Sequence, residues 1–591
     1  MDYSFCFYTQ SSASFPNAGY ELYVNSFIKP LIQSMLDNTK IRVSLSLSDA
    51  FINYLSKNAK EINLIFSDFL KANRMELLSN AYNNKMMSSL VPRDRMDAVD
   101  KTTTLISKVY STRAVSSYYG SYWNTNLVNP MSLLGLENLV VSSRDVVSGL
   151  IDTTNFRMNK NGKKINIVKT DPLVEKLVFE FSTKEISYES FEEKLKSLIL
   201  NKNDSTILMI NIDQLCKGAT LNKCNNPIYI ISSLLDALST RKDSFSLVKD
   251  SHVNKRGYLD SSFYSYDIKR GCLASPNQLL VKNESYRYYE NRVLALSELL
   301  QDLKKLPTSK KNINAILSKI PSNSMYYLDS TASCLRVKEL ELYYNSILES
   351  QRRLADLNIY PKPYDLDDDG LVEYFAVNKT TSAVLASRGA GVFELNSIAM
   401  AKNLFAVVSS FDDYKTTRKK DKCFLDKITI NDKTYDLEDK IFTLESKIKN
   451  KTEFIFTYSC DDFIINKAYK LSNQGIVLNV SLINKCKGKA KINYSLDLTF
   501  NANKKLVNDD NSLSADTYIL KYSSDLDNIS FSSSEPFTST DNDVWQEMPT
   551  CLGLENFYLY TKACMSYDFD LEENEEKTIQ IKTKFTTSKE Y

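Results

Sequence analysis

The chain has 591 residues, and at roughly 100–200 residues per domain this length indicates more than one domain. An apolar fraction of 43% and a charged fraction of 25% are typical of a globular protein and exclude a disordered one. Basic residues number 74 and acidic residues 72, so the net charge is +2, which argues against nucleic acid or an anionic membrane as the main partner. No stretch approaches about 18 consecutive apolar residues, so the sequence predicts no transmembrane helix.

Histidine and cysteine usage narrows the chemistry further. His252 is the one histidine, which excludes a His-based metal cluster and a Ser-His-Asp triad. The ten cysteines form no Cys-x-x-Cys pair, and residues 1–7 lack the basic and apolar regions of a secretion signal. The sequence therefore predicts a cytoplasmic protein with free thiols, and it leaves open whether the chain forms homo-oligomers.

Residues 1–275 alternate short apolar runs with amphipathic stretches, which predicts a parallel sheet closed into a (β/α)7-type barrel. The expected strands are Ser4–Tyr8, Ile41–Leu47, Glu76–Ser79, Val115–Tyr119, Leu139–Ser142, Ile165–Val168 and Ile207–Ile212. The clearest helices are Tyr23–Leu36, Glu61–Ala72, Pro92–Val109 and Tyr188–Leu200. In such barrels the chemistry lies at the carboxyl ends of the strands.

In the rest of the chain the spacing of apolar residues changes twice, first to a helical pattern and then to a strand pattern. Residues 276–360 predict a helical bundle, with helices at Glu284–Lys305, Lys310–Ile320 and Leu335–Asn358. Residues 361–591 predict an antiparallel β-sandwich. Its expected strands are Leu371–Val377, Phe424–Ile430, Glu453–Tyr458, Gly475–Leu482, Lys491–Leu498, Thr517–Tyr522, Phe557–Lys562 and Lys577–Phe585, and Ser532–Asp543 is expected as a polar loop. The predicted fold class is thus α/β followed by all-β.

Several segments, in order along the chain, resemble glycoside hydrolase family 57. They are Phe27–Leu31, Ser46–Phe51, Val91–Arg95, Leu279–Lys282, Tyr364–Glu373, Ala390–Leu395, Asn403–Leu404 and Lys422–Asp426. The resemblance covers most of the chain and is to the branch that holds 4-α-glucanotransferases and α-amylases. It implies a barrel, a helical segment and a sandwich, with α-glucan or an oligosaccharide as the ligand.

The functional motifs of that family are altered here. Its opening His-x-His-Gln-Pro corresponds to Phe7–Ser11, where Gln10 survives, and its Tyr-Glu-Pro keeps only Tyr82. Its nucleophile motif, Gly-x-Trp-x-x-Glu-x-x-x-x-Pro, corresponds to Gly120–Pro130, which places Thr125 where the glutamate stands. Its catalytic aspartate corresponds to Asp213.

These substitutions bear on catalysis because a retaining glycosidase needs two carboxylates about 5–5.5 Å apart, and a threonine hydroxyl cannot replace the nucleophile. The resemblance therefore implies a catalytically impaired protein of α-glucan metabolism, with a glucan-binding or regulatory role. Asp213 would hold the acid/base position and Thr125 the substituted nucleophile position. The substrate-binding side chains would be Gln10, Tyr82, Tyr122 and Trp123.

Two other hypotheses stay open. The chain could be an active 4-α-glucanotransferase or α-amylase whose nucleophile has moved to Glu137 or Asp145. It could also be a structural or interaction protein on the same scaffold.

One local motif suggests a metal. Asp365, Asp367, Asp369 and Glu373 surround Gly370 in the pattern of a calcium loop, because Ca²⁺ takes six to eight hard oxygen ligands from a tight turn. An EF-hand is not expected, since Ala376 stands at the twelfth position and a strand follows. A structural calcium site and a solvated acidic turn both remain open, and no other cofactor is expected.

Overall fold

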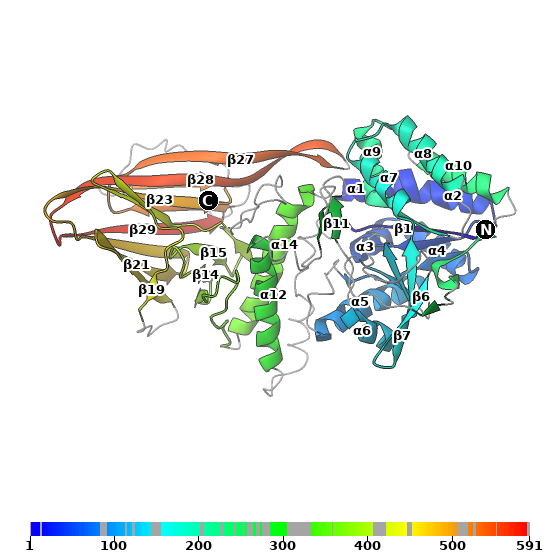
Figure 1. Cartoon of the computed structure of the whole chain (residues 1–591), viewed down its shortest axis with the longest axis horizontal. Coiled ribbons are helices and arrows are strands. Elements are labelled where there is room, and N and C mark those ends of the chain that lie inside the picture. Colours follow the sequence, from blue (N-terminus) through cyan, green and yellow to red (C-terminus); the bar gives the residue numbers. More distant parts are fainter. Residues whose placement is uncertain are drawn as a thin grey trace. The chain divides into compact units, whose positions relative to one another are not determined.

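The computed structural model consists of two compact units, each with its own core (Figure 1). It describes residues 2–11, 15–82, 92–112, 115–120, 125–142, 155–200, 206–224, 228–240, 244–251, 253, 255–256, 264–267, 272–274, 284–303, 333–356, 358–405, 421–445, 452–502, 504–505, 518–523, 527–550 and 552–587. The first unit comprises Met1–Leu280, Ser322–Glu339 and Glu547–Glu555. The second comprises Val281–Pro321, Leu340–Gln546 and Asn556–Tyr591.

The first unit is built on a parallel β-barrel. Within the described residues its strands are β1 (Asp2–Tyr8), β2 (Val43–Ser46), β3 (Met75–Leu77), β4 (Ser117–Tyr119), β5 (Asn138–Ser142), β7 (Lys163–Thr170) and β8 (Thr206–Asn211). Each corresponds to one of the seven strands predicted from the alternating pattern. The (β/α)7-type barrel is therefore confirmed.

The barrel closes through parallel pairings between neighbouring strands. β1 pairs with β2 and β8, β2 with β3, β4 with β5, and β5 with β7. Two short contacts complete the circle: Ser79 bridges to Tyr118 between β3 and β4, and Thr170 pairs with Ile207 between β7 and β8. The carboxyl ends of all these strands consequently lie at one mouth of the barrel.

Helices cover the outside of the barrel. They are α1 (Asn17–Tyr23), the π-helix η1 (Val24–Ile28), α2 (Lys29–Asp37), α3 (Asp49–Asn58), α4 (Lys60–Lys71), α5 (Pro92–Tyr110), η3 (Thr125–Leu127), α6 (Val128–Leu133), α7 (Pro172–Ser182), α8 (Tyr188–Leu200), α9 (Ile212–Leu221), α10 (Ile228–Ser239) and η4 (Val248–Asp250).

Polar residues at the strand ends start several of these helices. Ser48 accepts a hydrogen bond from the Phe51 amide, and Asn211 accepts one from the Gln214 amide. These N-caps turn the chain sharply at the barrel mouth.

Short strands supplement the barrel. β6 (Phe156–Lys160) forms an antiparallel hairpin with β7, and β9 (Ser244–Phe245) and β10 (Lys255–Arg256) pair with β1 and β6. β11 (Tyr264–Asp267) and β12 (Cys272–Ala274) form a separate pair. The sequence analysis did not predict β6, although Phe156–Lys160 alternates buried apolar with polar residues.

The second unit begins with α12 (Glu284–Leu303), includes α14 (Ser333–Ala355) from Leu340 onward, and continues as antiparallel strands. The strands are β13 (Tyr374–Val377), β14 (Thr381–Leu385), β15 (Val392–Ser397), β16 (Lys402–Asn403), β17 (Leu425–Ile430), β18 (Lys433–Asp436), β19 (Thr443–Leu444), β20 (Glu453–Ser459), β21 (Phe463–Ser472), β22 (Gly475–Asn484), β23 (Ala490–Phe500), β24 (Lys504–Lys505), β25 (Tyr518–Ser523), β26 (Asp527–Ser533), β27 (Thr538–Thr550), β28 (Gly553–Leu571) and β29 (Glu576–Thr587). All eight predicted β runs correspond to strands of this unit.

These strands form three antiparallel sheets. One has five strands in the order β18-β17-β23-β28-β27. Another has eight strands in the order β19-β20-β21-β22-β29-β26-β25-β24, and the third contains β13, β14, β15 and β16. Inward-facing side chains such as Phe456, Leu496 and Phe531 form one buried core. The expected antiparallel β-sandwich is confirmed.

Two parts of the sequence prediction have a different outcome. Ser532–Asp543 was expected as a loop, but β26 ends and β27 begins inside it. The expected helix Lys310–Ile320 lies outside the described residues, and a separate helical bundle over residues 276–360 stays a prediction.

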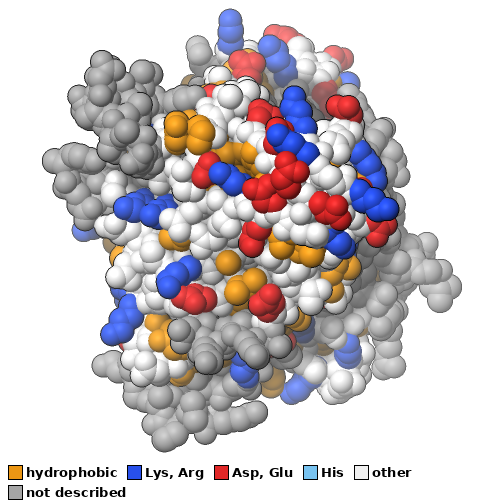
Figure 2. All heavy atoms as spheres, turned by 90° about the vertical axis from the view of Figure 1, so that its left-hand side faces the viewer, with side chains coloured by type: hydrophobic (Ala, Val, Ile, Leu, Met, Phe, Trp, Pro, Cys, Tyr) orange, Lys and Arg blue, Asp and Glu red, His pale blue; other side chains and the backbone are white. Residues whose placement is uncertain are grey.

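The surface carries charge of both signs. Figure 2 shows one face of the molecule on which Lys and Arg side chains are interspersed with Asp and Glu side chains. Every helix among the described residues is too short or too polar to cross a lipid bilayer.

Candidate functional site

Asp213 lies at the barrel mouth, in the first turn of α9 and two residues after β8 ends. Its Oδ2 accepts a hydrogen bond of 2.6 Å from the Gln10 amide, and the Tyr23 side chain also bonds to the carboxyl. Its Oδ1 is buried and has no hydrogen-bond partner among the described residues. Burial raises the pKa of this carboxyl to about 6, although the bonds from Gln10 and Tyr23 lower it. A carboxyl with that pKa can carry a proton near neutral pH, as a general acid must.

Tyr8 is the buried last residue of β1. Its ring packs on that of Tyr119, with the centroids 4.7 Å apart, and its hydroxyl bonds to the Tyr119 and Asn211 side chains. Burial raises the pKa of this phenol, and the charges of Glu175 and Asp213 raise it further. Tyr8 therefore stays neutral and can donate or accept hydrogen bonds at the mouth.

Glu175 is a second carboxylate at this mouth, and our sequence reasoning missed it. It lies in the first turn of α7, directly after β7, and accepts a hydrogen bond from the Thr170 hydroxyl. Its charge and that of Asp213 both act on Tyr8. A usable signal was present, because Glu175 follows the predicted strand Ile165–Val168 by only a few residues.

Gln10 and Tyr82 are also at the carboxyl ends of strands. Gln10 follows β1 and contacts Asp213 through its backbone amide. Tyr82 follows β3, with the Lys101 ammonium 5.8 Å from its ring centroid, and burial together with the charge of Asp49 raises its pKa. Both residues lie on the expected face of the barrel, and the structure brings Gln10 into contact with Asp213.

Thr125 contacts β6 through its hydroxyl. The hydroxyl accepts a hydrogen bond of 2.8 Å from the ammonium of Lys160, the last residue of β6. The placement of Thr125 at the same mouth as Asp213 stays a prediction.

The two relocated nucleophiles considered above have different outcomes. Glu137 is exposed and immediately precedes β5, so it lies at the amino end of the barrel, opposite Asp213. Asp145 lies outside the described residues, as do Tyr122 and Trp123.

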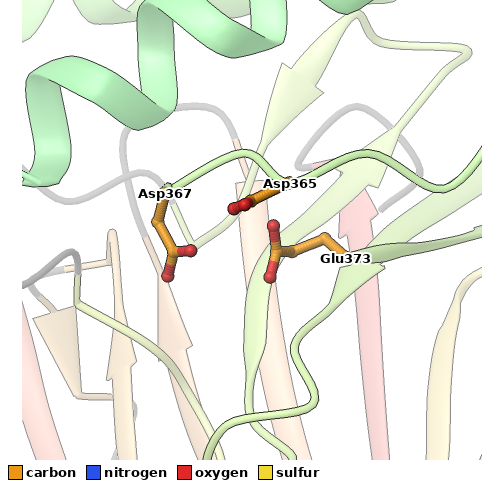
Figure 3. A group of neighbouring side chains, drawn as sticks. All are labelled: Asp365, Asp367 and Glu373. Atoms are coloured by element: carbon orange, nitrogen blue, oxygen red, sulfur yellow. The ribbon is translucent and has the colours of Figure 1, made fainter. Parts of the chain in front are cut away.

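The acidic loop of the second unit brings three carboxylates together (Figure 3). One oxygen from each of Asp365, Asp367 and Glu373 lies within 4.8 Å of the others. Burial, reinforced by the neighbouring charges, raises the pKa of Asp367 to about 6 and that of Glu373 to about 9. Hard oxygen ligands in such a group suit Ca²⁺.

Asp369, the fourth carboxylate of the motif, does not join this group. Its Oδ2 forms a 2.7 Å ion pair with Arg388, and its Oδ1 accepts a hydrogen bond from the Leu371 amide. Asp369 is therefore removed from the candidate ligands, because Arg388 neutralises it.

Comparison with known proteins shows which solved structures share this fold. No family model and no curated protein sequence matches the chain. Among solved structures, a 4-alpha-glucanotransferase from Thermococcus litoralis is similar with a TM-score of 0.76 and 13% identity, over 99% of each chain. A GH57 branching enzyme from Thermococcus kodakaraensis gives a TM-score of 0.47 at 10% identity, over 60% of this chain and 90% of that one.

At 13% identity the likeness to the 4-alpha-glucanotransferase establishes a shared fold. It spans both units, so the barrel and the sandwich occur in the same order along the two chains. The fold implied by the sequence resemblance is thus confirmed, and function has to be inferred from the residues at the barrel mouth.

Proposed function

We propose that the barrel mouth binds α-glucan chains and that the protein does not hydrolyse or transfer them. The observation that carries this proposal is the position of Asp213 in a fold shared with a 4-alpha-glucanotransferase. Its carboxyl, with a pKa of about 6, stands where barrel enzymes bind their substrates. The sequence resemblance assigned Asp213 to the acid/base position, and the proposal makes the same residue part of the glucan-binding site.

The surroundings of Asp213 suit a sugar. Asp213 is half-buried at the barrel mouth, and a carboxyl accepts hydrogen bonds from sugar hydroxyls. Gln10, whose backbone amide bonds to this carboxyl, carries a side-chain amide that can also bond to a sugar. The half-buried Tyr82 offers an aromatic face at the same end of the barrel, and such faces pack against pyranose rings. Binding therefore needs no second carboxylate.

Catalysis has a further requirement, because a retaining mechanism needs a nucleophilic carboxylate about 5–5.5 Å from the acid. Thr125 carries a hydroxyl in place of a carboxylate and bonds to Lys160, and Glu137 lies at the amino end of the barrel. Neither residue can attack an anomeric carbon beside Asp213. These positions support catalytic impairment.

Glu175 supports one alternative, an active α-glucan transferase or hydrolase. It stands at the same mouth as Asp213, and both charges act on Tyr8. Of the carboxylates considered, it is the best placed to act as a relocated nucleophile.

Binding is tested by retention of the full chain on immobilised amylose and elution with maltoheptaose. We expect specific retention, with no retention on cellulose. Gln10→Ala should weaken retention several-fold, because it removes a side chain at the mouth. Lys163→Ala is the control and should leave retention unchanged, since Lys163 is exposed at the amino end of β7. Failure of the unmodified chain to bind amylose would contradict the proposal and favour an interaction protein.

Activity is tested by incubation with maltohexaose and chromatography of the products. We expect no disproportionation and no hydrolysis. Turnover that is lost in both Asp213→Asn and Glu175→Gln would establish the alternative, with Glu175 as the nucleophile.

A further inference from the structure

The loop before β13 contains a buried acidic group that glucan binding does not use. We propose that Asp365, Asp367 and Glu373 bind one calcium ion, which fixes this loop in the second unit. The sequence motif leaves open a solvated acidic turn, and it contains four carboxylates where the structure selects three.

The spacing of the three carboxylates matches a calcium coordination sphere. Ca²⁺ binds oxygens at about 2.3–2.6 Å, so two ligands on opposite sides of the ion lie about 5 Å apart. One oxygen from each residue falls within 4.8 Å of the others, so a single ion can contact all three. In Figure 3 the three carboxyl groups face a common space.

A buried oxygen without a hydrogen-bond partner is a second indication of a bound cation, separate from the clustering of the three carboxylates. Asp367 is only 2% exposed, and its Oδ1 has no hydrogen-bond partner among the described residues. Leaving a buried acceptor without a partner is costly, and a bound cation would satisfy it. Figure 3 shows the Asp367 carboxyl directed toward Asp365 and Glu373.

Positive charge lies near these three residues without forming an ion pair with them, and the charge of Lys422 lowers the pKa of Asp367. Within the described residues none of the three forms an ion pair with Lys or Arg, whereas Asp369 pairs with Arg388 at 2.7 Å. The Lys422 ammonium donates instead to the Arg388 carbonyl oxygen at 3.2 Å. A solvated turn does not explain the group either, because Glu373 is only 1% exposed.

The backbone holds the ligands in place. The Leu366 amide donates to Glu373 Oε2 at 2.6 Å, and the amides of Asp369 and Gly370 donate to the two Asp365 oxygens. The left-handed conformation of Asp368 and Gly370 lets the loop turn tightly around the group. An irregular all-oxygen site favours Ca²⁺ over Mg²⁺, which demands near-octahedral geometry at shorter distances.

The same loop is tied to α12, which indicates what the ion would stabilise. Arg287 donates to the Asp367 carbonyl oxygen, and Asn291 donates to the Leu366 carbonyl oxygen, both at 3.1 Å. Fixing the loop would therefore also fix its contacts with this helix. We infer a structural ion that raises the stability of the second unit.

The first test uses the full chain after EDTA treatment and removal of the chelator. Calorimetric titration with CaCl₂ should show one site per chain, and MgCl₂ should bind more weakly. At about 100 times Kd, calcium should raise the melting temperature of the second unit by roughly 5 °C. No heat of binding and no thermal shift at millimolar CaCl₂ would overturn the proposal.

The second test separates the three ligands from the fourth carboxylate. Asp367→Asn should abolish calcium binding, whereas Asp369→Asn should keep the same stoichiometry and an affinity within a few-fold. Asp365→Asn, at a more exposed position, provides a second ligand variant if Asp367→Asn does not fold. Undiminished binding in the folded ligand variants, or equal loss in Asp369→Asn, would refute the assignment to these three residues.

Discussion

At the scale of single residues, Asp213 is held in an environment that opposes its charge. Burial outweighs the two hydrogen bonds that favour its ionised form, so its pKa rises from 3.8 to about 6. It is not the N-cap of α9, because Asn211 has that role. Carboxyl groups whose pKa is shifted by burial in this way cluster at functional sites.

The pH dependence of stability follows from this shift. The folded state holds the Asp213 proton more tightly than the unfolded state, so ionisation costs stability as the pH rises from about 4 to about 6, and the cost persists above that range. Asp213→Asn removes the charge. We expect it to be about 1–3 kcal/mol more stable than the unmodified protein at pH 8 and equally stable near pH 3.5.

Urea unfolding at the two pH values measures this difference. Asp68→Asn is the control, because Asp68 is exposed and pairs only with Lys71 among the described residues. That variant should show no comparable pH-dependent gain. A gain for Asp213→Asn that is the same at both pH values would contradict the explanation by burial.

At the scale of elements, β22 depends on a glycine at its start. Gly475 has φ of 154°, and a Cβ at this position would lie 1.9 Å from the Thr583 carbonyl oxygen of β29. β22 pairs along its length with both β21 and β29. A side chain at Gly475 would therefore push apart two central strands of the larger sheet.

Gly475→Ala should destabilise the second unit by at least about 2 kcal/mol, because backbone must move to relieve the contact. Gly488→Ala provides the comparison, since Gly488 also has positive φ but a Cβ there meets nothing within 4 Å. That variant should lose only about 1 kcal/mol of stability, because alanine is strained at positive φ. Chemical unfolding of the two variants measures both values, and equal losses would show that the clash is relieved freely.

At the scale of the whole molecule, the chain contains two separate hydrophobic cores. Phe7 belongs to the core between the barrel and its helices, and Phe531 belongs to the core of the sandwich, and both are fully buried. Each unit can therefore unfold as its own cooperative body.

We expect two transitions in scanning calorimetry. Phe7→Ala and Phe531→Ala each leave a large cavity that should cost about 3–5 kcal/mol in its own unit. Each variant should lower one transition and leave the other within a degree or two. A single transition that both variants lower equally would show that the units unfold together.

The sequence by itself determined the regular elements and their order. The seven barrel strands were predictable as short apolar runs between amphipathic stretches. Eight of the sandwich strands were predictable because a strand with one buried face alternates apolar and polar residues. β27 was missed since it is the edge strand of its sheet and its first residues are exposed, so that pattern is weak there. Asp213 was predictable too, because it directly follows a predicted strand.

The tertiary structure alone decided which side chains meet. Sequence spacing gave no sign that Thr125 would bond to Lys160 of β6. It also gave Asp367 and Asp369 equal standing in the acidic loop, whereas one lies in the buried group and the other pairs with Arg388. These outcomes depend on strand register and on partners distant in the chain, which local periodicity does not encode. That is the physical reason why the sequence predicted the scaffold well and the composition of its sites only in part.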